Sequence, residues 1–425
     1  MVRKLTAAAA LAMLASCAPE TQTPVKVRAL VRSSNGVYEP QQVELKTVTD
    51  IVSLEGKVVR LLGGASVRVD SKDPELQAAT TEEAVAKALV KTEGRPVNAS
   101  YITDEQGVLW PADFHTWNLV TTYYNFERAW DHFTVTAGVR PEELTQTTAY
   151  YFPEFVLTDV DDKPQRDNAL FFSPTKSFLV LPFEQVQSAP LAINASILTH
   201  EYAHLVFNRR VYGGSGLPEA IQAWSRTGGI PTPGLNVLKS LDEGLADFHA
   251  YVASCDSPYG CNPKILDTSF EGRTAEDRDL TNSRNCMTPE LYEQIRITNF
   301  NTFSGREYQV GTMLATALYK SSRIGTPADR QVLARAVADA YSDTDAARPG
   351  FAQLTRDFVE NQERFTLGRA VRAIVQHIKP GDDGLKNIVC TQLASTLRIP
   401  IPELTEGQGA CPSSTNPTSC GTTTP

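Results

Sequence analysis

Residues 199–207 of this chain read Thr199-His200-Glu201-Tyr202-Ala203-His204-Leu205-Val206-Phe207. On a helix, residues four apart share one face with their Cβ atoms about 5–6 Å apart, so His200 and His204 can present two imidazoles to one cation. Glu201 lies at the neighbouring edge, where a carboxylate can take a proton from a water molecule that a metal ion activates. The pattern predicts a metal site suited to hydrolysis.

A chance occurrence is the alternative. The chain has six histidines among 425 residues, so a random H-E-x-x-H pattern is expected in on the order of half a per cent of such chains. In that case the stretch is a surface helix with two polar histidines opposite an apolar side. That apolar side comprises Ile197, Leu198, Leu205 and Val206.

A metal site with two imidazoles needs at least one more protein ligand and an open coordination position. The helical pattern of residues 237–253 contains Glu243, which we expect to be this ligand. Asp247 follows one turn later and can accept the free N–H of a ligand histidine. Asp242, Asp247 itself and His249 are alternative ligands, and a solvated helix face is the alternative for the whole stretch.

The charge of the chain argues against nucleic acid as a partner. Its formal net charge is −9 and its pI is about 5.3, without a block of Lys and Arg. Nucleic-acid-binding domains carry basic patches, so no nucleic acid partner is expected. A length of 425 residues favours more than one domain.

The N-terminus has the pattern of a targeting segment. Arg3 and Lys4 precede a short apolar run at residues 5–14, which is too short to span a bilayer as a helix. The following Leu-Ala-Ser and Cys17 resemble the bacterial lipobox. This resemblance implies that residues 1–16 are a removed signal peptide and that Cys17 carries a lipid anchor. An ordinary secretory signal, with an incidental Cys17, is the alternative.

The anchor implies a location in the cell envelope. Ala18 after the cysteine, in place of an acidic residue, favours the outer membrane or the cell surface over the inner membrane in a Gram-negative host. Six further cysteines, an even number in an exported chain, predict disulfides in one of fifteen pairings, including a local Cys411–Cys420 bridge. These six are Cys255, Cys261, Cys286, Cys390, Cys411 and Cys420.

Composition and periodicity predict the organisation of the rest of the chain. Strand patterns precede residue 70 and recur between residues 149 and 181, and an aromatic-rich helix is expected at residues 111–133. Helical patterns dominate beyond residue 327. The predicted parts are a tether (17–24), a small α+β accessory domain (25–105), a catalytic core (110–325), a helical C-terminal lobe (326–400) and a disordered tail (401–425).

Several motifs together resemble the gluzincin metallopeptidases, in particular the thermolysin-like group and its fungalysin branch. They are His200-Glu201-Tyr202-Ala203-His204, Asn208-Arg209, Gly213-Gly214 and Glu243-Gly244-Leu245-Ala246-Asp247-Phe248. The resemblance implies that His200, His204 and Glu243 bind Zn²⁺ and that Glu201 is the general base. It also implies that Asp247 supports a ligand histidine.

Two further positions relate to that family. Asn168-Ala169 resembles the dipeptide on the family's edge strand, which holds the substrate backbone. Where the family has an oxyanion-stabilising histidine before a glycine on a later helix, this chain has Tyr308. A phenol can also donate to an oxyanion, although Tyr308 can equally be an aromatic residue at a helix start.

The resemblance implies an α+β fold: a thermolysin-like, two-lobed core with a mixed sheet and an active-site helix. The expected function is that of an exported, lipid-anchored zinc metalloendopeptidase acting on peptide or protein substrates. The alternative is a surface lipoprotein that keeps the scaffold as a binding module with weak or no catalysis.

Overall fold

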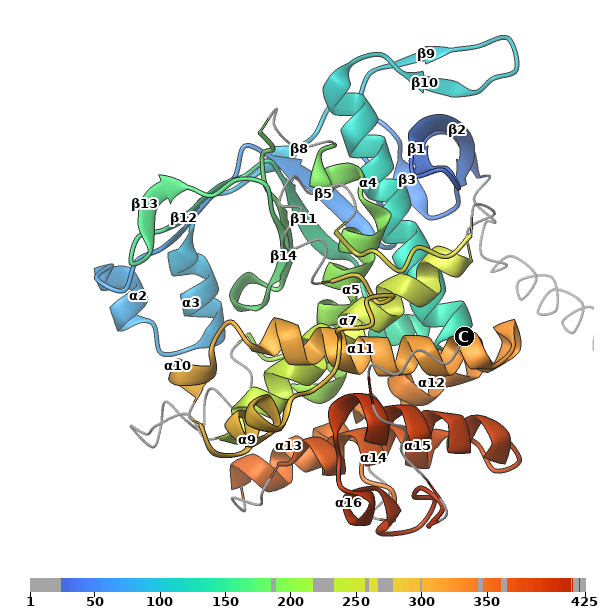
Figure 1. The fold of residues 1–425 in the computed structure, drawn as a ribbon. Helices are drawn as coiled ribbons and strands as arrows, with labels where there is room; N and C mark the ends of the chain where they lie inside the picture. Colours follow the sequence, from blue (N-terminus) through green and yellow to red (C-terminus); the bar gives the residue numbers. More distant parts are fainter. Residues whose placement is uncertain are drawn as a thin grey trace, which may run out of the picture.

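The structure is a computed structural model (Figure 1). It describes residues 24–184, 189–216, 233–256, 260–266, 278–298, 300–342, 347–360, 365–413, 415 and 420. The fold is mixed α and β, with a helical C-terminal region, as the sequence predicts. The predicted signal peptide, Cys17 and nearly all of the tether lie outside the described residues.

Three sheets form the β part of the described residues. The first has the order β2(Tyr38–Leu45), β1(Val25–Arg32), β10(Leu109–Pro111), β9(Tyr101–Thr103). The second has the order β14(Ala169–Phe172), β15(Ser177–Val180), β11(Thr147–Tyr151), β5(Val59–Gly63), β4(Glu55–Gly56), β3(Val48–Asp50), and β8(Arg95–Pro96) also pairs with β5. The third has the order β13(Asp161–Pro164), β12(Glu154–Leu157), β6(Ser66–Val69), β7(Val90–Thr92).

These sheets cross the predicted boundary near residue 105. Strand β5 pairs in parallel with β11, β6 pairs in parallel with β12, and β1 pairs with β10. Residues 25–105 therefore supply strands to the same sheets as the following segment. The second sheet is mixed, because β14 is antiparallel to β15 whereas β15 is parallel to β11.

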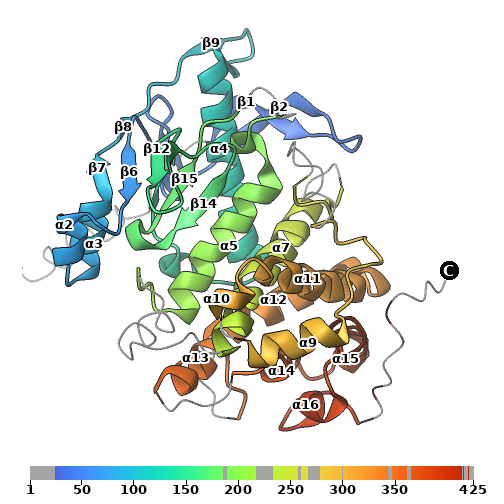
Figure 2. The same cartoon turned by 60° about the vertical axis from the view of Figure 1, so that its left-hand side comes forward.

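Three long helices connect the sheets to the rest of the fold: α4(Phe114–Asp131), α5(Ala195–Val211) and α7(Pro233–Cys255). Side chains cap the first two, because Asp113 accepts from the Thr116 N–H and Asn194 accepts from the Ile197 N–H. Helix α5 packs against both α4 and α7. Figures 1 and 2 show α5 and α7 running between the sheets and the C-terminal helices.

The aromatic residues of α4 differ in burial, and Phe114 at the start of the helix is exposed. Tyr123 and Phe126 are fully buried. His115 has a structural environment, with its Nδ1 2.9 Å from the Tyr151 hydroxyl oxygen. One apolar cluster extends from β1 through α4, α5 and α7 to α15, so the predicted core and C-terminal lobe share a continuous interior.

The C-terminal region is helical. Its elements are α9(Pro289–Ile297), α10(Phe300–Phe303), α11(Glu307–Ile324), α12(Pro327–Ser342), α13(Phe351–Glu360), α14(Leu367–His377), α15(Asp383–Leu397) and α16(Ile401–Thr405). The remaining helices are α2(Pro74–Ala78) and α3(Glu82–Leu89), a π-helix at His132–Thr136, and short 3-10 turns at Pro141–Glu143, Ser173–Thr175 and Leu191–Ile193. None of the described helices is long and apolar enough to cross a membrane.

The structure corrects two predictions about the C-terminus. The cysteines pair as Cys255–Cys261, Cys286–Cys420 and Cys390–Cys411, so the predicted Cys411–Cys420 bridge is wrong. The predicted disordered tail is wrong for its first part, because α16 lies within it and Leu404 is fully buried. Both disulfides of the tail connect to distant residues, which a local spacing rule does not indicate.

Candidate metal centre

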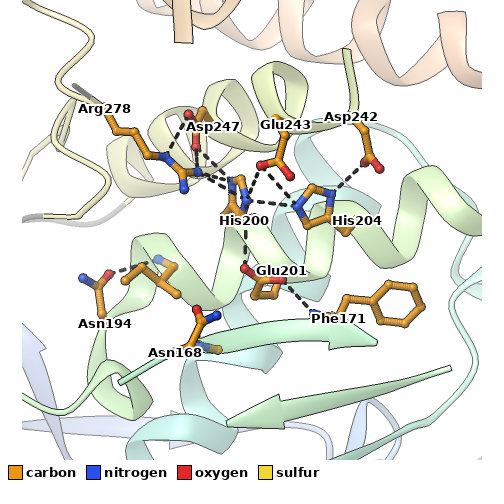
Figure 3. A network of polar contacts seen from close by, with 12 residues as sticks. Asn168, Phe171, Asn194, His200, Glu201, His204, Asp242, Glu243, Asp247 and Arg278 are labelled. Carbon is orange, nitrogen blue, oxygen red and sulfur yellow. Dashed lines mark hydrogen bonds and ion pairs between the residues drawn. The ribbon is translucent and has the colours of Figure 1, made fainter. Parts of the chain in front are cut away.

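Helix α5 presents both histidines of the H-E-x-x-H pattern toward α7 (Figure 3). The Nε2 atoms of His200 and His204 are 3.0 Å apart. His200, Glu201 and His204 each offer one ligand atom, and these atoms lie within 4.8 Å of one another. The group could therefore hold a metal ion, and it is built on one helix as the spacing predicts.

Glu243 approaches from α7 and faces both rings. Its Oε2 is 3.4 Å from Nε2 of His200 and 3.8 Å from Nε2 of His204. This oxygen is buried and has no hydrogen-bond partner within the described part of the chain. A buried carboxylate oxygen without a partner is costly, so its position requires compensation by a positive charge.

Two further carboxylates of α7 contact the outer ring nitrogens. Asp247 Oδ1 is 2.9 Å from Nδ1 of His200, and Asp242 Oδ1 is 2.7 Å from Nδ1 of His204. Each ring therefore has one nitrogen directed at a carboxylate and the other directed at Glu243. This arrangement fixes the orientation of a ligand imidazole and increases its basicity.

The structure excludes one of the alternative ligands. His249, on the same helix, is fully buried away from these residues, with its Nδ1 3.1 Å from Nε2 of His132. Six residues separate it from Glu243, which places it about 120° away around the helix. His249 is therefore not a ligand of this site, and the alternative that it binds the metal is wrong. Asp242, another of the alternative ligands, contacts Nδ1 of His204, which is the nitrogen of that ring that faces away from Glu243.

Arg278 is a member of the site that the sequence reasoning missed. Its guanidinium contacts the Asp247 carboxylate, and its Nη2 lies 3.0 Å from Nδ1 of His200. Arg278 follows residue 266 across a segment outside the described residues, and no spacing rule connects it to α5 or α7. The cluster of Glu201, Asp242, Glu243, Asp247 and Arg278 carries four carboxylates against one guanidinium.

Glu201 connects the helix to the edge of the second sheet. The Phe171 N–H donates to Oε2 of Glu201 at 2.7 Å, and Oε1 of Glu201 is 3.9 Å from Nε2 of His200. Phe171 belongs to β14, which is the edge strand of its sheet in the described part of the chain. Asn168 and Ala169, at the start of this strand, line the cavities beside Glu201.

The surroundings shift the pKa values of these groups. Burial lowers the pKa of His204, but the charges of Asp242 and Glu243 outweigh burial and raise it to about 10. Burial raises the pKa of Glu243, but the two histidines outweigh burial and lower it to about 2. The pKa of Glu201 is raised, chiefly by burial. The site thus favours positive charge beside an ionised Glu243.

The candidate centre opens to two cavities. The smaller, of about 260 Å³, lies toward Ser173, Asn208 and Lys239, and the larger, of about 960 Å³, lies toward Leu191 and Ile265. Tyr308, at the start of α11, lines both cavities and remains 47% exposed. The charge of Glu243 raises the pKa of Tyr308, so its phenol is protonated at neutral pH and can donate a hydrogen bond.

Comparisons with other proteins leave the chain without an assigned family. No model of a known protein family matches it, and a comparison with curated proteins gives no match.

Proposed function

We propose that the chain is a zinc-dependent metalloendopeptidase with His200, His204 and Glu243 as metal ligands. The observation that supports this most is the buried Oε2 of Glu243, which faces both Nε2 atoms without a hydrogen-bond partner in the described part of the chain. A divalent cation between the two helices would pair with this oxygen and with both Nε2 atoms at once, beside the Arg278 Nη2 that lies 3.3 Å from Nε2 of His200.

The donor set fits zinc. Zinc prefers imidazole and carboxylate ligands, and two atoms bound at about 2.0–2.1 Å in tetrahedral geometry lie roughly 3.3 Å apart. The corresponding separations among the three ligand atoms are 3.0, 3.4 and 3.8 Å. Four carboxylates surround the two rings against the single guanidinium of Arg278, so a divalent cation can replace the protons that the raised pKa values of His200 and His204 favour.

A bound zinc ion would supply Lewis-acid chemistry, lowering the pKa of water and polarising a carbonyl group. Glu201 has a raised pKa, so it suits a base that accepts a proton from water and passes it to the leaving amine. The outer edge of β14 can pair with an extended peptide at positions other than the Phe171 N–H, which donates to Glu201, with Asn168 and Ala169 at the start of the strand. Tyr308 would donate a hydrogen bond to the developing oxyanion.

The first test measures metal content and turnover on residues 18–425. We expect one zinc per chain and cleavage of an unfolded protein, with loss of cleavage on chelation and recovery on adding zinc. Glu201→Gln should keep the metal and abolish cleavage, because the amide has the size of the carboxylate but cannot accept the proton. Tyr308→Phe should keep the metal and lower kcat about 10²–10³-fold.

Two other outcomes of these measurements would contradict the proposed peptidase function. Stoichiometric zinc without cleavage of any member of a broad peptide library would favour the binding module, an alternative supported by Tyr308 in place of a histidine. Absence of bound metal would reject both the ligand set and the hydrolase. The lipid anchor at Cys17 and the outer-membrane or surface location also remain part of this proposal.

A further inference from the structure

The larger cavity beside Glu201 differs in chemistry from the smaller one. Its lining is mixed, with the apolar side chains of Leu191, Ile197, Ile265 and Met313 beside polar residues such as Asn168, Asn285 and Thr312. Two exposed arginines, Arg166 and Arg284, also line it, one from the segment before β14 and the other from the segment before α9. A substrate lying in this cavity would meet apolar and polar surface together with two guanidinium groups.

Neither arginine is neutralised within the described structure. No ion pair joins Arg166 or Arg284 to another of the described residues, whereas Arg278 is held by Asp247. Asp167, an acidic residue of the same cavity, uses its Oδ1 to accept the Glu184 N–H at 2.6 Å. Among the described residues, therefore, no ion pair occupies the two guanidinium groups.

We propose that this side of the cleft selects substrates that carry a carboxylate, and that Arg166 and Arg284 recognise it. This inference rests on the proposed peptidase function and adds a substrate class to it. Guanidinium groups bind carboxylates through two parallel N–H donors, more strongly than they bind neutral groups. The carboxylate can come from an Asp or Glu side chain or from the C-terminus of the substrate.

The volume of the cavity supports more than one substrate residue on this side. A cavity of about 960 Å³ is at the upper end of the range for small-molecule pockets, roughly 300–1,000 Å³. Polar and apolar residues line this cavity together with His200 and Glu201, and the two arginines add groups that recognise charge. The combination favours peptides that carry a carboxylate beyond the residue adjoining the scissile bond.

The test compares matched peptides that differ by one charge. A peptide series places Glu or Gln at successive positions on each side of the scissile bond, and a second series ends in a free carboxylate or an amide. We expect kcat/KM to be about 3–10-fold higher for the charged member, on one side of the bond only. The first series reports a side-chain carboxylate and the second a C-terminal one.

Variants then assign the effect to the two arginines. The double substitution Arg166→Ala with Arg284→Ala should bring the ratio between charged and neutral peptides close to one, chiefly through KM. Arg284→Glu should favour Lys over Glu at the same position. Arg95→Ala is the matched control, because Arg95 is an exposed arginine of β8 that lines neither cavity; it should leave the ratio unchanged.

Measurements of peptide binding test this inference independently of the proposed peptidase function. Titration of Glu201→Gln with fluorescent peptide pairs measures the preference without turnover. Tighter binding of the charged member would support the inference even if the wild-type chain cleaves nothing, an outcome that would reject the peptidase alone. Equal binding and equal cleavage of the pairs, or a preference that survives the double substitution, would overturn the inference.

Discussion

His200 and His204 are each held between two carboxylates of α7, one on either ring nitrogen. The spacing of residues 200–204 was sufficient to predict both histidines and Glu201 as one group, because a helix repeats every 3.6 residues. The same periodicity places Asp247 one turn after Glu243 on a second helix, but it leaves Asp242, Asp247 and His249 open as ligands, and the choice of Glu243 is what the resemblance implies. Arg278 could not follow from this periodicity, because its position depends on a tertiary contact.

Asp242 shows the limit of such reasoning for a single residue. Its acidic side chain beside Glu243 made it a plausible ligand, yet in the structure it accepts a hydrogen bond from Nδ1 of His204 at 2.7 Å. A carboxylate in this position orients the ring and strengthens its outward-facing nitrogen as a ligand. Whether Asp242 binds the metal or orients His204 depends on how α5 and α7 pack. The local sequence of neither helix determines that packing.

Replacing Asp242 with Asn is the corresponding prediction. The amide keeps the size of the side chain but removes the charge that favours the ligand tautomer of His204. We expect zinc affinity to fall about 10–100-fold, measured by competition with a chelator of known affinity. The melting temperature of the metal-free variant serves as the control for folding. Unchanged zinc affinity would show that Asp242 does not position His204.

At the level of secondary structure, the periodicity predicts where helices lie but not which residues pair as strands next to them. The pattern after residue 80 predicts a helix through residue 91, whereas α3 ends at Leu89 and residues 90–92 form β7. The cause is pairing of β7 with β6, a strand more than twenty residues earlier. Strand pairing at this separation overrides the local helical preference.

Helices α7 and α11 show a close approach that only the structure reveals. A Cβ atom on Gly244 would meet the backbone carbonyl of Gly311, and a Cβ atom on Gly311 would lie 2.8 Å from the backbone nitrogen of Gly244. Because backbone atoms cannot rotate away as side chains do, the two helices can approach this closely only with glycine at both positions. Glu243 is adjacent to this contact.

Gly244→Ala should therefore separate α7 from α11 and displace Glu243. Overpacking of this kind typically costs about 1–3 kcal/mol, so the free energy of unfolding of the metal-free protein should fall by that amount, and zinc affinity should fall with it. Denaturant unfolding and a zinc titration measure the two effects.

Gly384→Ala is the matched control for Gly244→Ala. Gly384 lies in α15, and a Cβ atom there would meet no atom within 4 Å. Alanine at such a helical position should be neutral or stabilise the protein by up to about 1 kcal/mol. If both variants behaved alike, the α7–α11 contact would not limit the position of Glu243.

In the whole molecule, connectivity between distant parts was the least predictable feature. Composition predicted a division near residue 105, yet β5 and β11 join across it in one sheet. An even cysteine count predicted disulfides but could not select among fifteen pairings. Packing of the complete chain determines which strand pairs with which and which cysteines are joined. Local sequence patterns therefore cannot predict these partners.

The disulfides differ strongly in the length of chain that they close. Cys286–Cys420 spans 134 residues and joins the C-terminal end of the chain to the segment before α9, whereas Cys255–Cys261 spans six. Restriction of the unfolded chain grows with the logarithm of loop length. The long bridge should therefore contribute more to stability.

We expect replacement of Cys286 and Cys420 by Ser to lower the free energy of unfolding by about 5 kcal/mol, against about 2 kcal/mol for Cys255 and Cys261. Denaturant unfolding of the oxidised, metal-free proteins measures both values, and the second pair is the matched control because it removes the same atoms from a short loop. Equal losses would mean that native contacts around each bridge, and not the restriction of the unfolded chain, determine its contribution. A larger loss for the long bridge would support restriction of the unfolded chain as the main source of its contribution.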